Sequence, residues 1–503
     1  MESPPSGVGL TPNRRRCYVW MGAYAIGCYT SIFGFGDSLL DTGNALHFYP
    51  PDDPPNFGRL PYGETFFHHP TGRCCDGRLI VDFIAQALGL PFLPPYFGGW
   101  NSSEAADFEK GVNFAVVGSQ ALDDSFFEER GMNVTYQNTS MRCQLSWFKD
   151  FLPSLCLPSS DCQKVLKSSL FILDFGGNDY GHALLAGRSV QEVQSYVPLV
   201  VNAIASTINE LIELGARTIM VAGGIPLGCL ALFLTEFISS NKEDYDPMTG
   251  CLTWFNNLVE YHNEQLQIEL NRIRELQPYA TIIYADYYNI AMPFYISPRK
   301  FGFTKGALVA CCGDGGPYNV NTSVLCGNPP STAADNPFLY VGWDGLHLTE
   351  AAYKLISKAL LEGPYTIPHI NTSCVSIAGS SEYLNYDPSL SLSSPTGLYP
   401  SRGLTSSTVL ETPFSHSLPL ENSGFTKRTL TACCRAGELP YHFHSSTPLM
   451  DSRVAIVEKL SVCRLRGLRQ IKEDVFLVVK IMDMVSMGSL CGTICQCVIG
   501  PTE

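Results

Sequence analysis

The stretch Ser31-Ile32-Phe33-Gly34-Phe35-Gly36-Asp37-Ser38 decides how the rest of the chain is organised. Its apolar run is typical of a buried strand, and Gly36 predicts the point at which that strand stops. Ser38 then lies just beyond the carboxyl end of the strand, where open α/β sheets bind their ligands. A serine in that place is a candidate nucleophile if a histidine can reach it, although Gly-Asp-Ser is also ordinary turn chemistry.

Other apolar runs along the chain alternate with amphipathic stretches. We expect four further strands, beginning at Gly111, Ser169, Arg217 and Ala280, the first of them reaching Gly118. Helical spacing of apolar residues predicts helices over residues 79–88, 189–214, 254–276 and 349–361. Strands that alternate with helices imply a parallel sheet covered on both faces, with the polar residues after each strand at one edge.

Composition limits the classes of partner. The chain has 503 residues, a formal charge of −14 and 45% hydrophobic residues, which describes a globular acidic protein. This charge argues against nucleic acid or an anionic membrane as the main partner. No run reaches the roughly 18 apolar residues of a membrane span. We therefore expect a small-molecule substrate, no nucleic acid and no transmembrane segment, and the oligomeric state stays open.

Cysteines and glycosylation motifs favour an oxidising compartment. The 19 cysteines include no Cys-x-x-Cys pair at zinc spacing, so disulfides are the preferred interpretation and no metal site is expected. Acceptor motifs for N-glycosylation begin at Asn101, Asn133, Asn138, Asn321 and Asn371. Together they predict a secreted glycoprotein, although residues 1–30 make a poor signal-like segment, with a short apolar part after Arg14-Arg15-Arg16.

A general base for Ser38 is best supplied by His347. Among the ten histidines it differs because Asp344 stands three residues before it, in a glycine-containing loop that opens a helix. One loop can then place both side chains, so that the carboxylate fixes the imidazole tautomer and leaves the second nitrogen to take the serine proton. The alternative is a solvated Asp-Gly turn before a helix.

Two residues are candidate donors to an oxyanion. Gly118 allows the backbone to approach a substrate closely, and the Asn178 amide follows a tight Gly176-Gly177 turn. The alternatives are a glycine that merely ends a strand and an ordinary Asx turn.

Taken together, these motifs resemble those of a known family. Their order is that of the SGNH hydrolases, and the chain resembles the plant branch, the GDSL esterase/lipases. The resemblance covers about residues 28–370 and is carried by Phe35-Gly-Asp-Ser-Leu-Leu-Asp-Thr-Gly-Asn44, Leu60-Pro-Tyr-Gly-Glu-Thr-Phe-Phe67, Pro70-Thr-Gly-Arg73, Gly111-Val-Asn-Phe-Ala115, Gly176-Gly-Asn-Asp179 and Asp344-Gly-Leu-His347-Leu-Thr-Glu-Ala-Ala-Tyr353.

The resemblance implies a flavodoxin-like three-layer α/β/α fold and cofactor-free hydrolysis of carboxylic esters. Ser38 would be the nucleophile, His347 the base and Asp344 its orienting acid. The backbone N–H groups of Ser38 and Gly118 and the side chain of Asn178 would form the oxyanion hole. The chain looks closest to the sinapine-esterase and acetylajmalan-esterase-like group, which favours small acyl or phenolic esters over long-chain lipids. Residues 117–120 depart from the small residues usual in that block.

The tail does not continue the α/β pattern. We expect a hydrolase domain over residues 31–369 and an irregular, poorly ordered tail over 370–503. Within the tail, Gly424-Phe-Thr-Lys427 and Ala432-Cys-Cys434 repeat Gly302-Phe-Thr-Lys305 and Ala310-Cys-Cys312, so residues 413–440 are interpreted as a partial internal copy. Two alternatives to a serine esterase follow: an inactive or binding protein on the same scaffold, because of the tail, and a carbohydrate O-acetylesterase.

Overall fold

The computed structural model describes residues 29–101, 108–132, 138–155, 162–370 and 372. The signal-like segment, apart from its last two residues, and the internal copy at 413–440 lie outside the described residues. So do two of the glycosylation candidates, Asn133 and Asn371. Of the others, Asn101 ends a helix, Asn138 is exposed, and half-buried Asn321 donates from Nδ2 to Asp314 Oδ2 at 3.2 Å.

A six-stranded sheet forms the centre of the molecule. Its strand order is β2-β1-β3-β4-β5-β8, and the first five of these strands are parallel. The strands are β1 (Ser31–Gly36), β2 (Gly111–Asn113), β3 (Ser169–Asp174), β4 (Thr218–Ala222), β5 (Thr281–Ala285) and β8 (Thr366–Ile367). This order of the parallel strands is the flavodoxin-like one, so the predicted fold class is confirmed. The antiparallel edge strand β8 was not predicted.

The apolar run of β1 follows from its place in the sheet. It pairs with β2 on one side and β3 on the other, and all six of its residues are buried. A strand covered on both faces needs no alternation of apolar and polar residues, unlike a strand with one wet face. On one of these faces Phe33 and Phe35 both contact Phe148, with ring centroids 5.4 and 5.5 Å apart.

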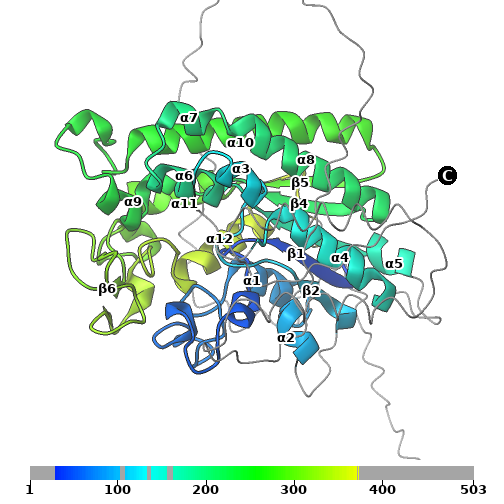
Figure 1. Cartoon of the computed structure of the whole chain (residues 1–503), viewed down its shortest axis with the longest axis horizontal. Helices are drawn as coiled ribbons and strands as arrows, with labels where there is room; N and C mark the ends of the chain where they lie inside the picture. The colour runs from blue at the N-terminus through cyan, green and yellow to red at the C-terminus, as the bar shows by residue number, and fades with distance from the viewer. Residues whose placement is uncertain (1–28, 102–107, 133–137, 156–161, 371, 373–503) are drawn as a thin grey trace, which may run out of the picture. The chain divides into compact units, whose positions relative to one another are not determined.

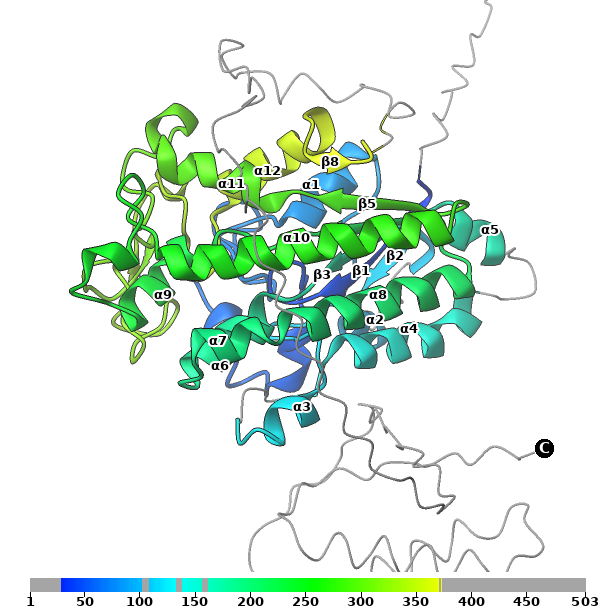
Figure 2. The ribbon, with the colours of Figure 1, turned by 90° about the horizontal axis from the view of Figure 1, so that it is seen from above.

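Helices cover both faces of the sheet. Figures 1 and 2 show α8 (Val197–Leu214) and α10 (Thr253–Leu276) side by side on one face, with α4 (Met141–Leu155) next to α8. On the other face, α12 (Glu350–Glu362) packs against α1 (Ile80–Ala87) and α11 (Tyr287–Ile296). The remaining named elements are α2 (Tyr96–Asn101), α3 (Asp124–Glu128), α5 (Cys162–Lys167), α6 (Gly177–Leu185), α7 (Val190–Gln194), α9 (Ala231–Glu236), β6 (Cys312–Gly313) and β7 (Thr332–Ala333).

Two predicted elements are corrected by the structure. The helix expected over 189–214 is two helices, α7 and α8, and Pro198 lies in the first turn of α8, where its missing N–H costs no bond. The strand expected to reach Gly118 ends at Asn113. Beyond it the backbone still bonds β1, from Phe114 N to Gly34 O and from Val116 N to Gly36 O, while the Asn113 side chain donates to Leu40 O and accepts from Ala115 N.

The apolar stretch at α7 and α8 also bears on membrane insertion. Among the described residues, Val190–Leu214 is long and apolar enough to cross a membrane, with a mean hydropathy of 1.3. Half of it is buried inside the protein, including Val200, Ile204 and Ile208, which are at most 1% exposed. Since a core helix meets the same criteria of length and hydropathy, packing in the core accounts for this composition.

Disulfides join residues in the segments that connect β4 to β5 and β5 to β8. Cys229 pairs with Cys251, and Cys312 pairs with Cys326. Cys74 and Cys75, which are adjacent in the sequence, remain buried thiols. The described residues therefore contain both bridges and thiols, as an odd cysteine count allows.

Candidate active site

Ser38 lies in the turn that follows β1. The Asp37 carbonyl accepts from the N–H groups of Leu40 and Asp41, so the chain turns sharply around the serine. Gly36 is required just before it, because a Cβ atom there would lie 2.8 Å from the Asp174 carbonyl oxygen of the neighbouring strand. Ser38 is 6% exposed, so the serine is largely shielded from solvent.

His347 reaches this hydroxyl from a segment 309 residues further along the chain. Its Nε2 lies 2.8 Å from Ser38 Oγ, and its Nδ1 lies 2.7 Å from Asp344 Oδ2. The loop between the acid and the base is closed by Asp344 Oδ1, which accepts from His347 N at 2.8 Å. Gly345 adopts φ +98° in this loop, a conformation that favours glycine. Thr349 then caps α12 as predicted, accepting from Ala352 N.

Asp344 is held in its charged form. Burial alone would raise its pKa, but the charge of His347 and the hydrogen bonds from His347 and Leu346 outweigh burial and lower the pKa of Asp344 to about 2. A carboxylate in that state holds the proton on Nδ1 of the imidazole. Nε2 is then free to accept the proton of the serine hydroxyl.

Asn178 lies beside the serine but its amide is already engaged. It stands in the first turn of α6, after Gly176 with φ +118°. Its Nδ2 donates to Asp37 Oδ2 and to Ser119 O, both at 3.0 Å. An amide has two N–H donors, so both are used. An oxyanion would have to replace one of these acceptors.

The space beside the Gly118 backbone is nearly empty of other atoms. Gly118 has φ +79°, and a Cβ built there would meet a single group, His182 Cε1, at 3.9 Å. The loop that carries it is fixed by Asp41, whose Oδ2 accepts from Val117 N at 3.0 Å. The same side chain accepts from Gly43 N and Asn44 N at 2.7 Å, so one carboxylate joins the Ser38 turn to the Gly118 loop. Burial raises the pKa of Asp41 to about 6.

Several residues at the site were not identified from the sequence. Besides Asp41, these include Asp179, whose carboxylate accepts from Ala121 N and Leu122 N at 2.9 and 3.0 Å. Burial raises the pKa of Asp179 to about 7. Both acids stand in the motifs quoted above: Asp41 comes three residues after Ser38, and Asp179 directly follows Asn178. This closeness in the sequence could have identified them as residues of the site.

Tyr62 was also missed. The sequence suggests only that the loop over 49–72 rims the site. In the structure, the Tyr62 hydroxyl donates to Asp344 Oδ2 at 2.8 Å. A tyrosine more than 280 positions away from Asp344 carries no sequence signal for this contact.

Two other described histidines, His262 and His47, make contacts of their own elsewhere. His262 on α10 is 1% exposed and its Nδ1 lies 2.7 Å from Tyr180 Oη, whereas the neighbouring Tyr261 is half-buried. Burial lowers the pKa of His262 to about 4. His47 stacks on Phe97 with ring centroids 4.7 Å apart. His442 and His444 lie outside the described residues.

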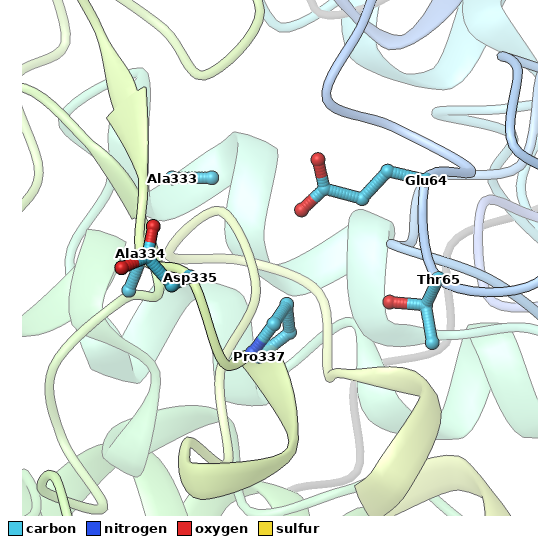
Figure 3. A pocket seen from close by; sticks show the side chains of 6 residues that line it. All are labelled: Glu64, Thr65, Ala333, Ala334, Asp335 and Pro337. Atoms are coloured by element: carbon cyan, nitrogen blue, oxygen red, sulfur yellow. The ribbon is translucent and has the colours of Figure 1, made fainter.

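A hollow of about 340 Å³ lies away from these groups. Figure 3 shows Glu64 and Thr65 on one side of it and Ala333, Ala334, Asp335 and Pro337 on the other, with Glu64 pointing into the space. An adjoining hollow of about 370 Å³ shares residues 333–335. Neither is lined by Ser38, His347 or Asn178. Among the described residues, no group of three His, Cys, Asp or Glu side chains could hold a metal ion.

Known proteins resemble this chain over most of its described part. The sequence profile of one family, GDSL-like Lipase/Acylhydrolase, matches residues 32–360. A GDSL esterase/lipase of Arabidopsis thaliana is 50% identical over 349 residues, which are 69% of this chain and 89% of that protein. Sinapine esterase of Brassica napus is 48% identical over 352 residues, 70% of this chain and 90% of that protein.

One solved structure with a similar chain trace is an acetyl xylan esterase from Geobacillus stearothermophilus. It is 14% identical and has a TM-score of 0.29, covering 67% of this chain and 95% of the other. A likeness at that level bears on no substrate.

Proposed function

This chain belongs to the GDSL-like lipase/acylhydrolase family, and from that premise we propose that it hydrolyses small acyl or phenolic esters through an acyl-Ser38 intermediate. It is a carboxylic ester hydrolase, and the two plant relatives named above are 50% and 48% identical to it over 349 and 352 aligned residues. The observation that carries the proposal is the continuous chain of contacts from Ser38 Oγ to His347 at 2.8 Å and from His347 to Asp344 at 2.7 Å.

The reaction follows from these contacts. His347 Nε2 removes the proton of Ser38 as Oγ attacks the ester carbonyl, and Asp344 stabilises the imidazolium that forms. The imidazolium then gives its proton to the departing alcohol, which leaves Ser38 acylated. A water molecule attacks the acyl-serine as the same imidazole takes its proton, and the imidazolium then returns that proton to Ser38 Oγ as the carboxylic acid leaves.

The negative charge of the tetrahedral intermediate needs preorganised donors. We assign this part to the backbone N–H groups of Ser38 and Gly118 and to Asn178 Nδ2. Since Nδ2 is bound to Asp37 and Ser119, the oxyanion displaces one of these acceptors as charge develops on it. An interaction made only at that stage stabilises the transition state more than the bound substrate.

Small or phenolic acyl groups are supported by one named relative. Sinapine esterase shares 48% of its aligned residues with this chain. Turnover of p-nitrophenyl acetate, p-nitrophenyl palmitate, a sinapoyl ester and acetylated xylan would rank the classes. Preference for the palmitate would contradict the proposal, and preference for acetylated xylan would establish the carbohydrate O-acetylesterase instead.

A serine-reactive fluorophosphonate tests the mechanism directly. We expect it to label the wild-type chain and not Ser38→Ala. Ser31→Ala is the matched control, because Ser31 lies at the other end of β1 and bonds Ser169 Oγ at 2.7 Å. Equal labelling of wild type and Ser38→Ala would remove Ser38 from the mechanism.

We also propose that residues 31–369 form the catalytic domain and that the protein is secreted and glycosylated. The family match over 32–360 supports the first, and the two disulfides with the acceptor motifs support the second. Mass spectrometry of the native protein would fix both termini and any glycans. An inert full chain beside an active chain ending at residue 370 would favour the inactive or binding protein.

A further inference from the structure

We propose that Tyr62 is a positioning residue that acts through Asp344: its hydroxyl competes with His347 for one carboxylate oxygen and thereby sets how firmly the imidazolium is held. This inference rests on the proposed function, because it concerns the base of the same reaction. It adds a fourth side chain to the serine, histidine and aspartate.

The contacts of Asp344 carry the argument. Oδ1 accepts from two backbone N–H groups, those of Leu346 at 3.0 Å and His347 at 2.8 Å. Oδ2 accepts from His347 Nδ1 at 2.7 Å and from the Tyr62 hydroxyl at 2.8 Å. The two side-chain donors therefore share one oxygen at nearly equal distances.

A second hydrogen bond, from Asn56, fixes the position of the Tyr62 hydroxyl. The hydroxyl accepts from Asn56 Nδ2 at 3.2 Å, and the same amide donates to Cys326 O at 3.1 Å. Cys326 is tied to Cys312 by a disulfide, so the bridged loop holds the segment that carries the tyrosine. The Tyr62 ring packs nearly perpendicular to the Trp343 ring, with ring centroids 5.8 Å apart. Tyr62 as a whole is 1% exposed.

Tyr62 stays protonated and can act only as a donor to the carboxylate. Burial, together with the charge of Asp344, raises the pKa of Tyr62 well above its usual value. A hydrogen bond to a carboxylate withdraws part of its charge, which leaves less for the second donor on the same oxygen. Removing the hydroxyl should therefore strengthen the attraction between Asp344 and a protonated His347.

Other groups face this pair and must be kept unchanged in any test. Asp37 lies close enough to His347 for their charges to interact. The Cys74 thiol and the Tyr353 hydroxyl face Asp344 in the same way, and both remain uncharged because burial raises the pKa of each well above its usual value. The Tyr62 hydroxyl, by contrast with these three groups, donates a hydrogen bond directly to the Asp344 carboxylate.

The experiment compares Tyr62→Phe with wild type and with Tyr196→Phe. Tyr196 is the matched control, because its hydroxyl also donates to a carboxylate, Glu192 Oε1, at 2.7 Å, but next to α7 and away from Ser38. Two rates are measured from pH 4.5 to 9: kcat/KM for p-nitrophenyl acetate and fluorophosphonate inactivation. We expect the acid limb of both profiles to move to higher pH by about 0.5–1 unit in Tyr62→Phe, and not at all in the control.

A merely structural role would lower the melting temperature and the plateau rate without moving the acid limb, and that result would overturn the proposal. Asn56→Ala provides a second variant should Tyr62→Phe fail to fold, since it removes the donor that polarises the hydroxyl. Asn56→Ala should move the acid limb of the pH profile in the same direction by a smaller amount. A profile that coincides with that of wild type would count against the proposal. Wild type that is not labelled at Ser38 would instead refute the proposed function, and this inference with it.

Discussion

Two carboxyl groups flank the Ser38–His347 contact, and they have opposite properties. The Asp344 side chain is 9% exposed and Asp37 is 4% exposed, so both are largely removed from water. Yet the pKa of Asp344 is lowered to about 2, whereas burial raises the pKa of Asp37 to about 6. The difference shows that burial alone does not decide the charge of a carboxyl group in this site.

Hydrogen-bond donors and the nearby histidine decide it. Asp344 accepts from two backbone N–H groups, an imidazole and a phenol. Asp37 accepts from Leu39 N at 3.0 Å and from the Asn178 amide, and the charge of Asp41 adds repulsion. The first carboxyl group is thus kept ionised beside the imidazole, and the second, with its pKa raised to about 6, accepts a hydrogen bond from the Asn178 amide.

The largest effect is expected from Asp344→Asn. An amide cannot hold the Nδ1 proton as a carboxylate does, so the imidazole loses its productive tautomer. We expect kcat/KM to fall by about 10³–10⁴-fold at neutral pH, with the fold retained. Measured esterase rates and the circular dichroism spectrum check this. A loss below tenfold would mean that Asp344 does not orient the base.

Asn178→Ala should have the next largest effect. It removes one oxyanion donor, which typically lowers kcat by about 10²–10³-fold. KM should change little, because the amide is bound to Asp37 and Ser119 before the oxyanion forms. Steady-state kinetics with p-nitrophenyl acetate separate the two parameters. An effect confined to KM would show that Asn178 binds substrate and not the transition state.

The two carboxyl groups also predict opposite dependences of stability on pH. The pKa of Asp344 is depressed to about 2 on folding, so its stabilisation is present above an unfolded pKa of about 3.9 and is lost as the pH falls. The pKa of Asp37 is raised to about 6, so its contribution is favourable below pH 4 and is lost as the pH rises through 6.

Urea unfolding of the two Asn variants at several pH values measures this contrast. Relative to wild type, Asp344→Asn should lose about 2–3 kcal/mol at pH 7 and progressively less towards pH 3. The stability of Asp37→Asn relative to wild type should instead rise by about 2 kcal/mol between pH 4 and pH 7. Two parallel curves would contradict the assignment of opposite shifts.

The smallest effect on activity is expected from a substitution in the hollow of Figure 3, because its Asp335 carboxylate does not contact Ser38 or His347. Asp335 lines this hollow and is exposed to solvent. Asp335→Asn should change kcat/KM by less than about twofold, because exposed charges are strongly screened. A tenfold loss on any ester of the substrate panel would extend the binding region to the hollow.

Local sequence was sufficient for the central sheet and for naming the candidate residues of the site. The buried run before Ser38, the glycine breaks and the helical periodicities predicted the parallel α/β sheet and the helices α1, α10 and α12, together with the stretch of α7 and α8, whereas α4 and α11 were not predicted. Asp344 and His347 could be paired because three residues of one loop separate them, a spacing that is visible in the sequence. The division at Pro198 could also have been anticipated, since proline favours the first turn of a helix.

Contacts between distant segments could not be predicted in this way. The sequence by itself determined the strand ends, turns and caps, and with them the candidate side chains of the site, because these features depend on neighbours within a few residues. Only the tertiary structure decided how those groups are partnered: Tyr62 on the oxygen that His347 uses, and Asp37 on the Asn178 amide. Hydrogen bonding and burial act through space, so the charge of each carboxyl group is set by segments that the chain brings together only when it folds.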